Sequence, residues 1–340
     1  MDVRAALARL AEGHDLSQDE TRQTFLEVMS GEATPAQIGA LLMGLRVKGE
    51  TAAEIAGAAQ TMRELSVRVE VDVPYLVDTC GTGGSGVKLF NVSTAAAFVA
   101  AAAGAHVAKH GNRKMTSASG SADVLEAAGV NLALTPAQIA ACIRDVGVGF
   151  LFAQAHHSAM RHAAPVRQEL GVRTLMNVLG PLTNPAGARR QVIGVFSPLW
   201  QERLAEVSLL LGAEHVLVVH SNGLDEIALD GPTWVVELKD GAISSYQIEP
   251  GDFGIDARGV AALRSDSPGQ SLALVRQALS EPDSAAADIV ALNAGAAIYA
   301  AGVATTLGNG IVMAQDVIAA GLAQERLDEL VRISSLMGEP

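Results

Sequence analysis

The feature that most constrains the fold of this 340-residue chain is a change of pattern near Val67. Before it, apolar residues recur at helical spacing in amphipathic runs that end at glycines. After it, short β-rich runs alternate with helical runs, which is typical of an α/β sheet with helices packed on its faces. We therefore expect a small all-helical domain over residues 1–70, joined by a helical segment near 165–185, and a larger α/β domain over residues 71–340.

Capping and turn residues set the expected boundaries. Pro35 at a first helical position and Gly49 as a stop delimit one helix, and Thr51-Ala-Ala-Glu54 is a capping box that begins the next. Lys239-Asp240-Gly241 predicts the turn of an antiparallel hairpin, so the sheet should be mixed but mainly parallel. The expected helices include Val3–Leu10, Gln18–Met29, Ile38–Lys48, Thr51 to about Leu65 and Ala285–Ala301, and the expected strands are Tyr75–Cys80, His106–Ala108, Val148–Phe152, Gln191–Phe196, His215–His220, Thr233–Leu238 and Ala242–Ile248.

Composition excludes several classes of protein. Apolar residues make up 49% of the chain, too many for an intrinsically disordered protein. The net charge of −13 disfavours nucleic-acid binding, and two cysteines are too few for a disulfide framework or a Cys-rich metal site. The longest apolar stretch, Ala95 to Gly104, is far shorter than the roughly 20 residues that span a bilayer. We therefore expect a cytoplasmic protein with no nucleic-acid or membrane partner.

A glycine-rich segment follows the first expected strand. Four glycines occur within Gly81-Thr-Gly-Gly-Ser-Gly86, and a helix should begin near Ser93-Thr94. Glycine permits positive φ and lets amide N–H groups approach an anion, to which the helix N-terminus adds its positive dipole end. This pattern predicts a phosphate-binding loop, with a flexible turn as the alternative. The glycine spacing also matches a dinucleotide-binding loop, but that requires an acidic residue about 20 positions later, where this chain is basic.

A second polar loop follows the next strand. Residues 109–121 contain Lys109, His110, Asn112, Arg113, Lys114 and four hydroxyl side chains. Fixed cations and hydroxyl donors at the C-terminal end of a strand suit a phosphate or pyrophosphate. From residue 85 to residue 190, ten Lys and Arg residues stand against four Asp and Glu residues, so this stretch carries a charge of +6 within an acidic chain.

Two further segments complete the candidate site. Arg167 lies in a segment that begins with His156-His157. A guanidinium can bind a carboxylate through two hydrogen bonds and imidazoles can line an aromatic acid, although an exposed basic helix face is the alternative. Asp225 and Glu226 follow the strand His215–His220. Beside a polyphosphate they would suit Mg²⁺, which prefers carboxylate and phosphate oxygens; by themselves they also fit a solvated turn.

In this order, the segments resemble the anthranilate phosphoribosyltransferase family. The resemblance runs from the N-terminal helices to about Leu336 and so covers essentially the whole chain. Six matches in register are more specific than any single glycine loop. They are Gly81-Thr-Gly-Gly, Asn91-Val-Ser-Thr94, Lys109-His-Gly-Asn-Arg113, Ser119-Gly-Ser-Ala-Asp123, Asn177-Val-Leu-Gly-Pro-Leu-Thr-Asn-Pro185 and Gly223-Leu-Asp-Glu226.

The resemblance implies a reaction in tryptophan biosynthesis. The 5-phosphoribosyl group of 5-phosphoribosyl-1-pyrophosphate (PRPP) would pass to the amine of anthranilate, with release of pyrophosphate. It also implies Mg²⁺ as cofactor, held by Ser93, Asp225 and Glu226, and assembly as a homodimer. The residues implied around PRPP are Gly81, Gly84, Ser85, Leu89, Asn91, Val92, Ser93, Thr94, Lys109, His110, Gly111, Asn112, Arg113, Ser117 and Ser121.

The same resemblance implies the anthranilate contacts. Gly81, Asn112 and Arg167 would touch this substrate, and His110 and Pro181 would line its path. Mechanistically, cationic donors would stabilise the departing pyrophosphate while Arg167 fixes the carboxylate so that the amine faces the ribose C1. No residue stands out as an obligatory general base, and His110 is a candidate only by its expected proximity.

Two positions depart from the family pattern. Ser85 stands where the family usually has Asp, and Leu89 stands where a small hydroxyl residue is common. These departures affect the expected PRPP and metal affinity and leave the expected reaction unchanged. Two other functions are alternatives: a nucleoside phosphorylase of the same fold, which Arg167 disfavours, and a non-catalytic nucleic-acid-binding homologue, which the Asp225-Glu226 pair and the net charge disfavour.

Overall fold

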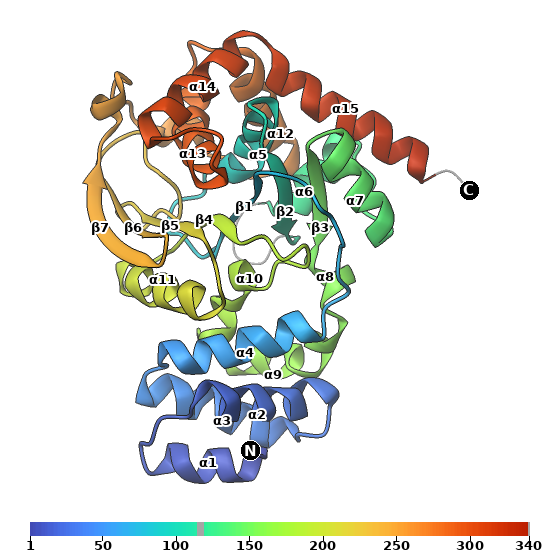
Figure 1. Ribbon diagram of the computed structural model, residues 1–340, viewed down its shortest axis with the longest axis vertical. Coiled ribbons are helices and arrows are strands. Elements are labelled where there is room, and N and C mark those ends of the chain that lie inside the picture. The colour runs from blue at the N-terminus through green and yellow to red at the C-terminus, as the bar shows by residue number, and fades with distance from the viewer. Residues whose placement is uncertain (114–118, 339–340) are drawn as a thin grey trace.

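The computed structural model describes residues 1–113 and 119–338 (Figure 1). Helices from the start of the chain form the lower part of the molecule, and a sheet with helices on both faces forms the upper part. The expected fold class, an all-helical N-terminal part beside a mixed sheet flanked by helices, is therefore confirmed. Ser117, one of the residues implied around PRPP, lies outside the described residues.

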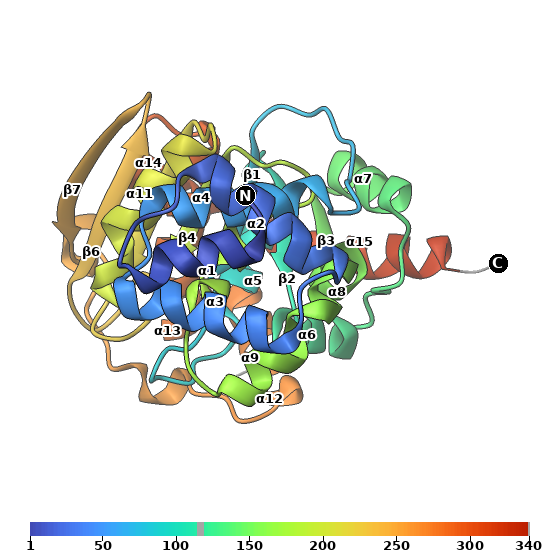
Figure 2. The same cartoon turned by 90° about the horizontal axis from the view of Figure 1, so that it is seen from below.

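The four N-terminal helices pack together beneath the sheet, as the view from below shows (Figure 2). Each begins with a side chain that accepts a hydrogen bond from a backbone amide of the first turn, which satisfies a donor that the helix itself leaves open. The predicted capping box of Thr51 and Glu54 is present. The helices are α1 (Val3–Ala11), α2 (Gln18–Ser30), α3 (Pro35–Lys48) and α4 (Ala52–Glu64), and their caps are Asp2, Ser17, Thr34 and Thr51.

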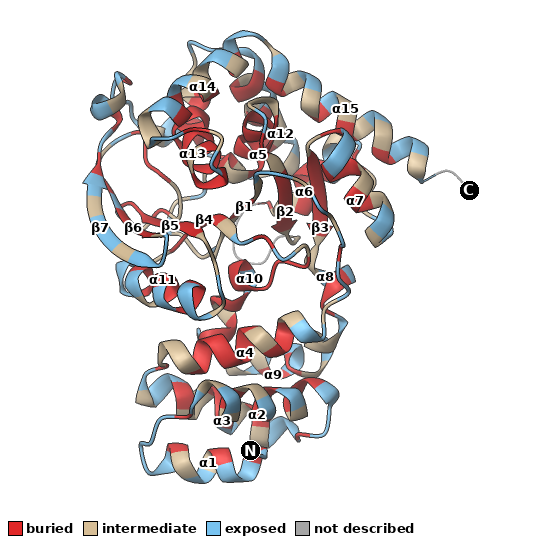
Figure 3. Cartoon of the chain, viewed as in Figure 1, coloured by how far each residue is buried: buried red, intermediate tan, exposed pale blue. Residues whose placement is uncertain are grey.

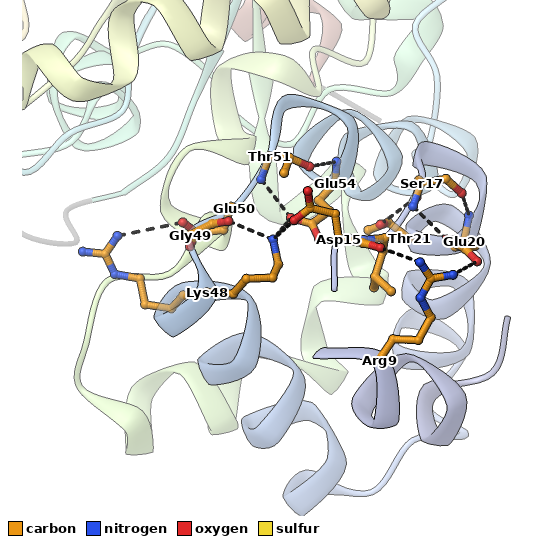
Figure 4. A network of polar contacts seen from close by, with 12 residues as sticks. Arg9, Asp15, Ser17, Glu20, Thr21, Lys48, Gly49, Glu50, Thr51 and Glu54 are labelled. Carbon is orange, nitrogen blue, oxygen red and sulfur yellow. Dashed lines mark hydrogen bonds and ion pairs between the residues drawn. The ribbon is translucent and has the colours of Figure 1, made fainter. Parts of the chain in front are cut away.

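Glu54 does more than close its capping box (Figure 4). Its side chain is fully buried and accepts hydrogen bonds from the amide of Leu16 (2.9 Å), the amide of Thr51 (2.8 Å) and the ammonium of Lys48 (3.0 Å). Lys48 also donates to Asp15 at 2.6 Å. One carboxylate therefore ties the start of α4 to the end of α3 and to the segment before α2.

Glu54→Ala is expected to lower the free energy of unfolding by about 3 kcal/mol, because it removes the buried acceptor of the Leu16 and Thr51 amides and one of the two carboxylates that pair with Lys48. Urea unfolding followed by circular dichroism measures this loss. Glu20→Ala is the matched control, since Glu20 closes the capping box of α2 from a more exposed position, and it should cost about 1 kcal/mol. Equal losses in the two variants would contradict the buried role of Glu54.

The sheet has seven strands in the order β3-β2-β1-β4-β5-β6-β7. The first five strands along the chain run parallel to one another, and the last two pairings, β5 with β6 and β6 with β7, are antiparallel, so the sheet is mixed and mainly parallel, as expected. Asp240 (φ 50°) and Gly241 (φ 79°) make the predicted hairpin turn. The strand expected at His106–Ala108 continues to Gly111, because its pairing with β3 continues to that residue. The strands are β1 (Leu76–Gly81), β2 (His106–Gly111), β3 (Val148–Phe152), β4 (Arg190–Gly194), β5 (His215–His220), β6 (Thr233–Lys239) and β7 (Ala242–Ile248).

Alanine-rich helices cover the upper face of the sheet (Figure 3). In α13 (Ala285–Ala301), 14 of 17 residues are buried, and a Cβ built at Gly295 would overlap Ile311 of α14 (Leu307–Ala319), so small residues allow the close approach of these helices. No single described helix is long and apolar enough to cross a membrane; α12 (Pro268–Ser280) and α13 pass only as a pair, bent by 76°. The other helices of this domain are α5 (Val92–Ala102), α6 (Ser121–Ala128), α7 (Pro136–Asp145), α11 (Gln201–Leu210) and α15 (Leu322–Met337).

The segment after β3 leaves the sheet and packs against the N-terminal helices. Its helix α9 (Ala164–Leu170) contacts α3, and α10 (Leu179–Leu182) contacts α4. Arg63 of α4 donates from Nε to the carbonyl oxygen of Leu182 at 2.6 Å. The segment also contains α8 (Ala153–His156) and single turns at Ser158–His162 and Leu175–Asn177. One apolar cluster therefore runs from the N-terminal helices through this segment to the lower face of the sheet.

Candidate active site

The parallel strands bring three predicted loops to one edge of the sheet. β1 lies between β2 and β4, and the strand order reverses there, so the carboxyl ends of these strands frame a crevice of the kind in which α/β proteins bind ligands. The glycine-rich loop follows β1, the basic loop follows β2, and Asp225-Glu226 comes after β5.

The glycine-rich loop closes over Asp225. Gly83 (φ 68°) and Gly84 (φ 83°) have left-handed backbone conformations that favour glycine. The amide of Gly83 donates to Asp225 Oδ2 at 3.1 Å. Gly81 and Gly194 pair between β1 and β4, and a Cβ on either would overlap Asp225. The glycines therefore make room for a carboxylate at the ends of the two strands.

Asp225 and Glu226 form a half-buried acidic pair. Glu226 Oε1 accepts a hydrogen bond from the amide of Ser93 at 3.2 Å. Burial raises the pKa of Asp225, and the hydrogen bonds from Ser85 and Gly83 oppose that rise. Burial, together with the neighbouring charge of Asp225, raises the pKa of Glu226 to about 8. The three residues implied for the metal thus lie together, and the charge of Lys109 and the hydrogen bonds from Ser93 only partly offset the effect of burial on the pKa of Glu226.

This arrangement fits Mg²⁺ carried by a polyphosphate. Among the described residues no group of three or more His, Cys, Asp or Glu side chains is placed to hold a metal ion. Mg²⁺ commonly binds one or two carboxylates together with phosphate oxygens and water, so two adjacent carboxylates are sufficient once the polyphosphate supplies the remaining ligands.

The raised pKa of Glu226 predicts a pH-dependent stability. Because its ordinary pKa is 4.5, between pH 4.5 and about 8 the folded protein holds a proton that the unfolded chain releases. The free energy of unfolding contributed by this bound proton is fully present below pH 4.5 and is lost as the pH rises through 8. In the ligand-free protein, Glu226→Gln should therefore gain about 4 kcal/mol of stability relative to wild type between about pH 5 and 8.5, measured by urea unfolding. A difference between the two proteins that does not change with pH would contradict this.

A buried carboxylate on β1, Asp78, contacts the end of β2, where the basic loop begins. Asp78 accepts hydrogen bonds from the amide of His110 (3.1 Å) and the side-chain amide of Asn184 (2.8 Å). Lys109 is also buried and donates from Nζ to the carbonyl oxygen of Thr79. Burial raises the pKa of Asp78, and the charge of Lys109 opposes this. Sequence reasoning missed the role of Asp78, although a charged residue inside an otherwise apolar strand was a visible signal.

Arg113 is engaged by carboxylates of α6. Its guanidinium pairs with Glu126 through two hydrogen bonds (2.7 and 2.8 Å) and with Asp123 at 3.3 Å. It also lies 5.6 Å from the centroid of the Phe152 ring. A contact between Arg113 and PRPP would require exchange of these partners, so this contact stays a prediction.

The other residues implied around PRPP have varied surroundings. Asn91 accepts hydrogen bonds from the hydroxyls of Ser119 (2.8 Å) and Ser271 (2.7 Å), and the buried hydroxyl of Thr94 has no partner among the described residues. Leu89 packs against the apolar core and pairs with Arg264 through a β-bridge. Several of these residues therefore serve packing or neighbouring loops. Val92 is in the core, a Cβ built at Gly111 would overlap Ser121 and Phe150, and Ser121 donates to the carbonyl oxygen of Asn112 at 3.4 Å.

His110, which the resemblance implies to line the anthranilate path, lies near two other buried histidines, His156 and His157. The rings of His110 and His157 are 5.2 Å apart, and each, like His156, has a ring nitrogen with no hydrogen-bond partner among the described residues. Burial lowers the pKa of His110 to about 3 and that of His157 to about 4. These imidazoles are therefore neutral near pH 7, and His110 is poorly matched to a general base.

Arg167, on α9, is half-buried, and its guanidinium has no hydrogen bond or ion pair to the part of the chain that is described. Burial lowers its pKa. A cation withdrawn from water without a partner is costly, and a carboxylate would supply both the missing charge and two acceptors.

Comparison with known proteins shows the family to which the chain belongs. Residues 4–66 match the helical bundle domain of a glycosyl transferase family, and residues 73–324 match its a/b domain. The chain is similar to the anthranilate phosphoribosyltransferases of Ectopseudomonas mendocina (55% identity; 99% of this chain and 98% of that protein) and Hahella chejuensis (56%; 100% and 99%).

Solved structures give the same result. The enzyme from Thermus thermophilus is 44% identical, with a TM-score of 0.93 over 98% of this chain and 100% of that one. A complex of the Saccharomyces cerevisiae enzyme with PRPP and Mg is 25% identical, with a TM-score of 0.88 over 98% of both chains. The fold and the two matched domains thus define a glycosyl transferase with a helical bundle domain and an a/b domain. Within that class, the chain belongs to the anthranilate phosphoribosyltransferase family.

Proposed function

We infer that this protein transfers the 5-phosphoribosyl group of PRPP to the amine of anthranilate and releases pyrophosphate, the second step of tryptophan biosynthesis from chorismate. The observation that carries this inference is the convergence of a glycine-rich loop and an acidic pair with raised pKa values at one sheet edge, in a chain whose Arg167 guanidinium lacks a partner among the described residues. The yeast relative bound to PRPP and Mg supports the same substrate class.

The residues divide between the two substrates. Amides of the glycine-rich loop and the ammonium of Lys109 would stabilise negative charge on the departing pyrophosphate. Mg²⁺, which would be held by Ser93, Asp225 and Glu226, supplies further neutralisation of that charge when bound. Arg167 would fix the anthranilate carboxylate and so direct the amine at the ribose C1. His110 stays neutral and contributes a wall of the aromatic path.

A kinetic assay tests this function directly. Anthranilate fluorescence should fall with time only when protein, PRPP and Mg²⁺ are all present. Phosphate-dependent cleavage of nucleosides without that fall would favour the nucleoside phosphorylase alternative. Binding to DNA that weakens steeply with salt would favour the nucleic-acid alternative.

We also propose that the protein is a cytoplasmic homodimer. Its two cysteines, Cys80 and Cys142, are unpaired, which is usual in a reducing compartment. The dimer is proposed from the family resemblance. Light scattering should give twice the 35.0 kDa mass of the chain, and a mass equal to one chain would contradict the dimer.

A further inference from the structure

The glycine-rich loop is held by an arginine that the proposed function does not yet use. Arg173 lies between α9 and the turn Leu175–Asn177, and its Nη2 donates to the carbonyl oxygen of Gly84 at 2.8 Å. Its guanidinium carbon lies 3.9 Å from the centroid of the Phe196 ring, just beyond β4. A stacked aromatic ring keeps a guanidinium in one plane, so the donor is presented to the loop in a defined direction.

The shape of the loop depends on this contact. Gly84 has a φ of 83°, and a Cβ built on it would overlap the Arg173 guanidinium, so the guanidinium occupies the space that a side chain would fill. The C=O and N–H of a trans peptide point in opposite directions. With its carbonyl oxygen held by Arg173, the Gly84–Ser85 peptide therefore directs the Ser85 N–H away from that arginine.

The other anchors of the loop cannot replace Arg173. The loop ends are held by backbone bonds, from Thr82 to Gly194 (2.8 Å) and from Gly86 to Gly223 (3.3 Å). Near the centre, Gly83 is bound to Asp225. Because Asp225 is a proposed metal ligand, that bond competes with metal binding, whereas the bond from Arg173 does not.

Arg173 also connects the two substrate regions. It lies six residues after Arg167, in the segment that packs against the N-terminal helices. The loop proposed for PRPP thereby contacts the segment that carries the residue proposed for anthranilate.

We propose that Arg173, supported by the Phe196 ring, is a positioning residue for PRPP: it holds the centre of the glycine-rich loop so that its amides are oriented to receive the pyrophosphate. The identity of this ligand rests on the proposed function. Arg173 acts through the loop backbone and takes no part in the chemical step.

Hydrogen–deuterium exchange on the ligand-free protein tests the contact itself. In Arg173→Gln, peptides covering residues 81–88 should exchange about tenfold faster than in wild type, because the loop centre loses the bond that a charged donor makes. Arg161→Gln is the matched control, since Arg161 is exposed and has no hydrogen bond or ion pair within the described ranges, and it should leave exchange unchanged. Unchanged exchange in Arg173→Gln overturns the proposal.

Steady-state kinetics tests the positioning role. Arg173→Gln should raise the KM for PRPP about tenfold and leave kcat and the KM for anthranilate within about twofold of wild type. Arg173→Lys should recover part of the loss, because an ammonium can still reach the Gly84 carbonyl, and Phe196→Leu should give an intermediate KM. Faster exchange with an unchanged KM for PRPP, or a fall in kcat alone, overturns the role. A wild-type protein that consumes no PRPP refutes the proposed function, while exchange still reports on the contact.

Discussion

The double variant Asp225→Asn/Glu226→Gln is expected to lower kcat/KM for PRPP by about a thousandfold or more. The acidic pair is half-buried, and burial together with the charge of Asp225 raises the pKa of Glu226 to about 8, so its surroundings favour a bound cation. Without the two charges, Mg²⁺ carried by the pyrophosphate would lose both of the carboxylates proposed to hold it, with Ser93 the only proposed ligand left. The anthranilate fluorescence assay, run over a range of PRPP and Mg²⁺ concentrations, measures this loss.

Urea unfolding of this double variant shows whether a loss of activity comes from the missing carboxylates or from a less stable fold. Because Glu226→Gln removes a group that is costly to ionise, the double variant should unfold at the same or a higher urea concentration than wild type at pH 8. Asp230→Asn, which removes one exposed charge a few residues further along, is the control and should keep full activity. Undiminished use of PRPP by the double variant would refute the metal role of the pair.

Arg167→Ala is expected to raise the KM for anthranilate about a hundredfold while the dissociation constant of Mg²⁺–PRPP changes little. The guanidinium has no partner within the described part of the chain, so its removal costs little stability and mainly removes the donor pair for a carboxylate. Initial rates at saturating PRPP, together with calorimetric titration of PRPP, measure the two quantities separately.

Two further variants serve as controls for Arg167→Ala. Arg167→Lys keeps the charge but loses the planar pair of donors, so it should fall between wild type and Arg167→Ala. Arg161→Ala removes an exposed arginine from the preceding turn and should behave as wild type. If Arg167→Ala used anthranilate with unaltered kinetics, the carboxylate contact would be wrong.

The elements that sequence predicted well depend on local physics. The capping box at Thr51 and Glu54, the hairpin turn at Asp240-Gly241 and the glycine-rich loop after β1 are each set by residues only a few positions apart. Hydrophobic periodicity and glycine conformation act over the same short range, so the change from a helical to an α/β pattern near Val67 was visible before any tertiary contact was known.

The contacts that sequence analysis did not predict mostly join segments that are far apart in the chain. Arg173 lies 89 residues after Gly84, and Asn184 lies 106 residues after Asp78. Arg113, expected to face a phosphate, is paired with Glu126 one helix later. For Arg173 and Asn184 the partner was determined by which segment the tertiary fold brought near, and for Arg113 by how α6 packs beside the loop; a single sequence contains no direct signal for either.

The sequence by itself therefore determined which chemistry this protein carries: a loop that can bind an anion, a basic segment, an acidic pair and an arginine suited to a carboxylate, each recognisable from residue type and short spacing. Only the tertiary structure decided how these groups are presented. The parallel order of β1, β2, β4 and β5 gathers the loops at one edge, and packing withdraws the acidic pair and Arg167 from water. Burial and distance determine the pKa of an ionisable group and the energy of its interactions with other charges, and both arise only when the chain is folded.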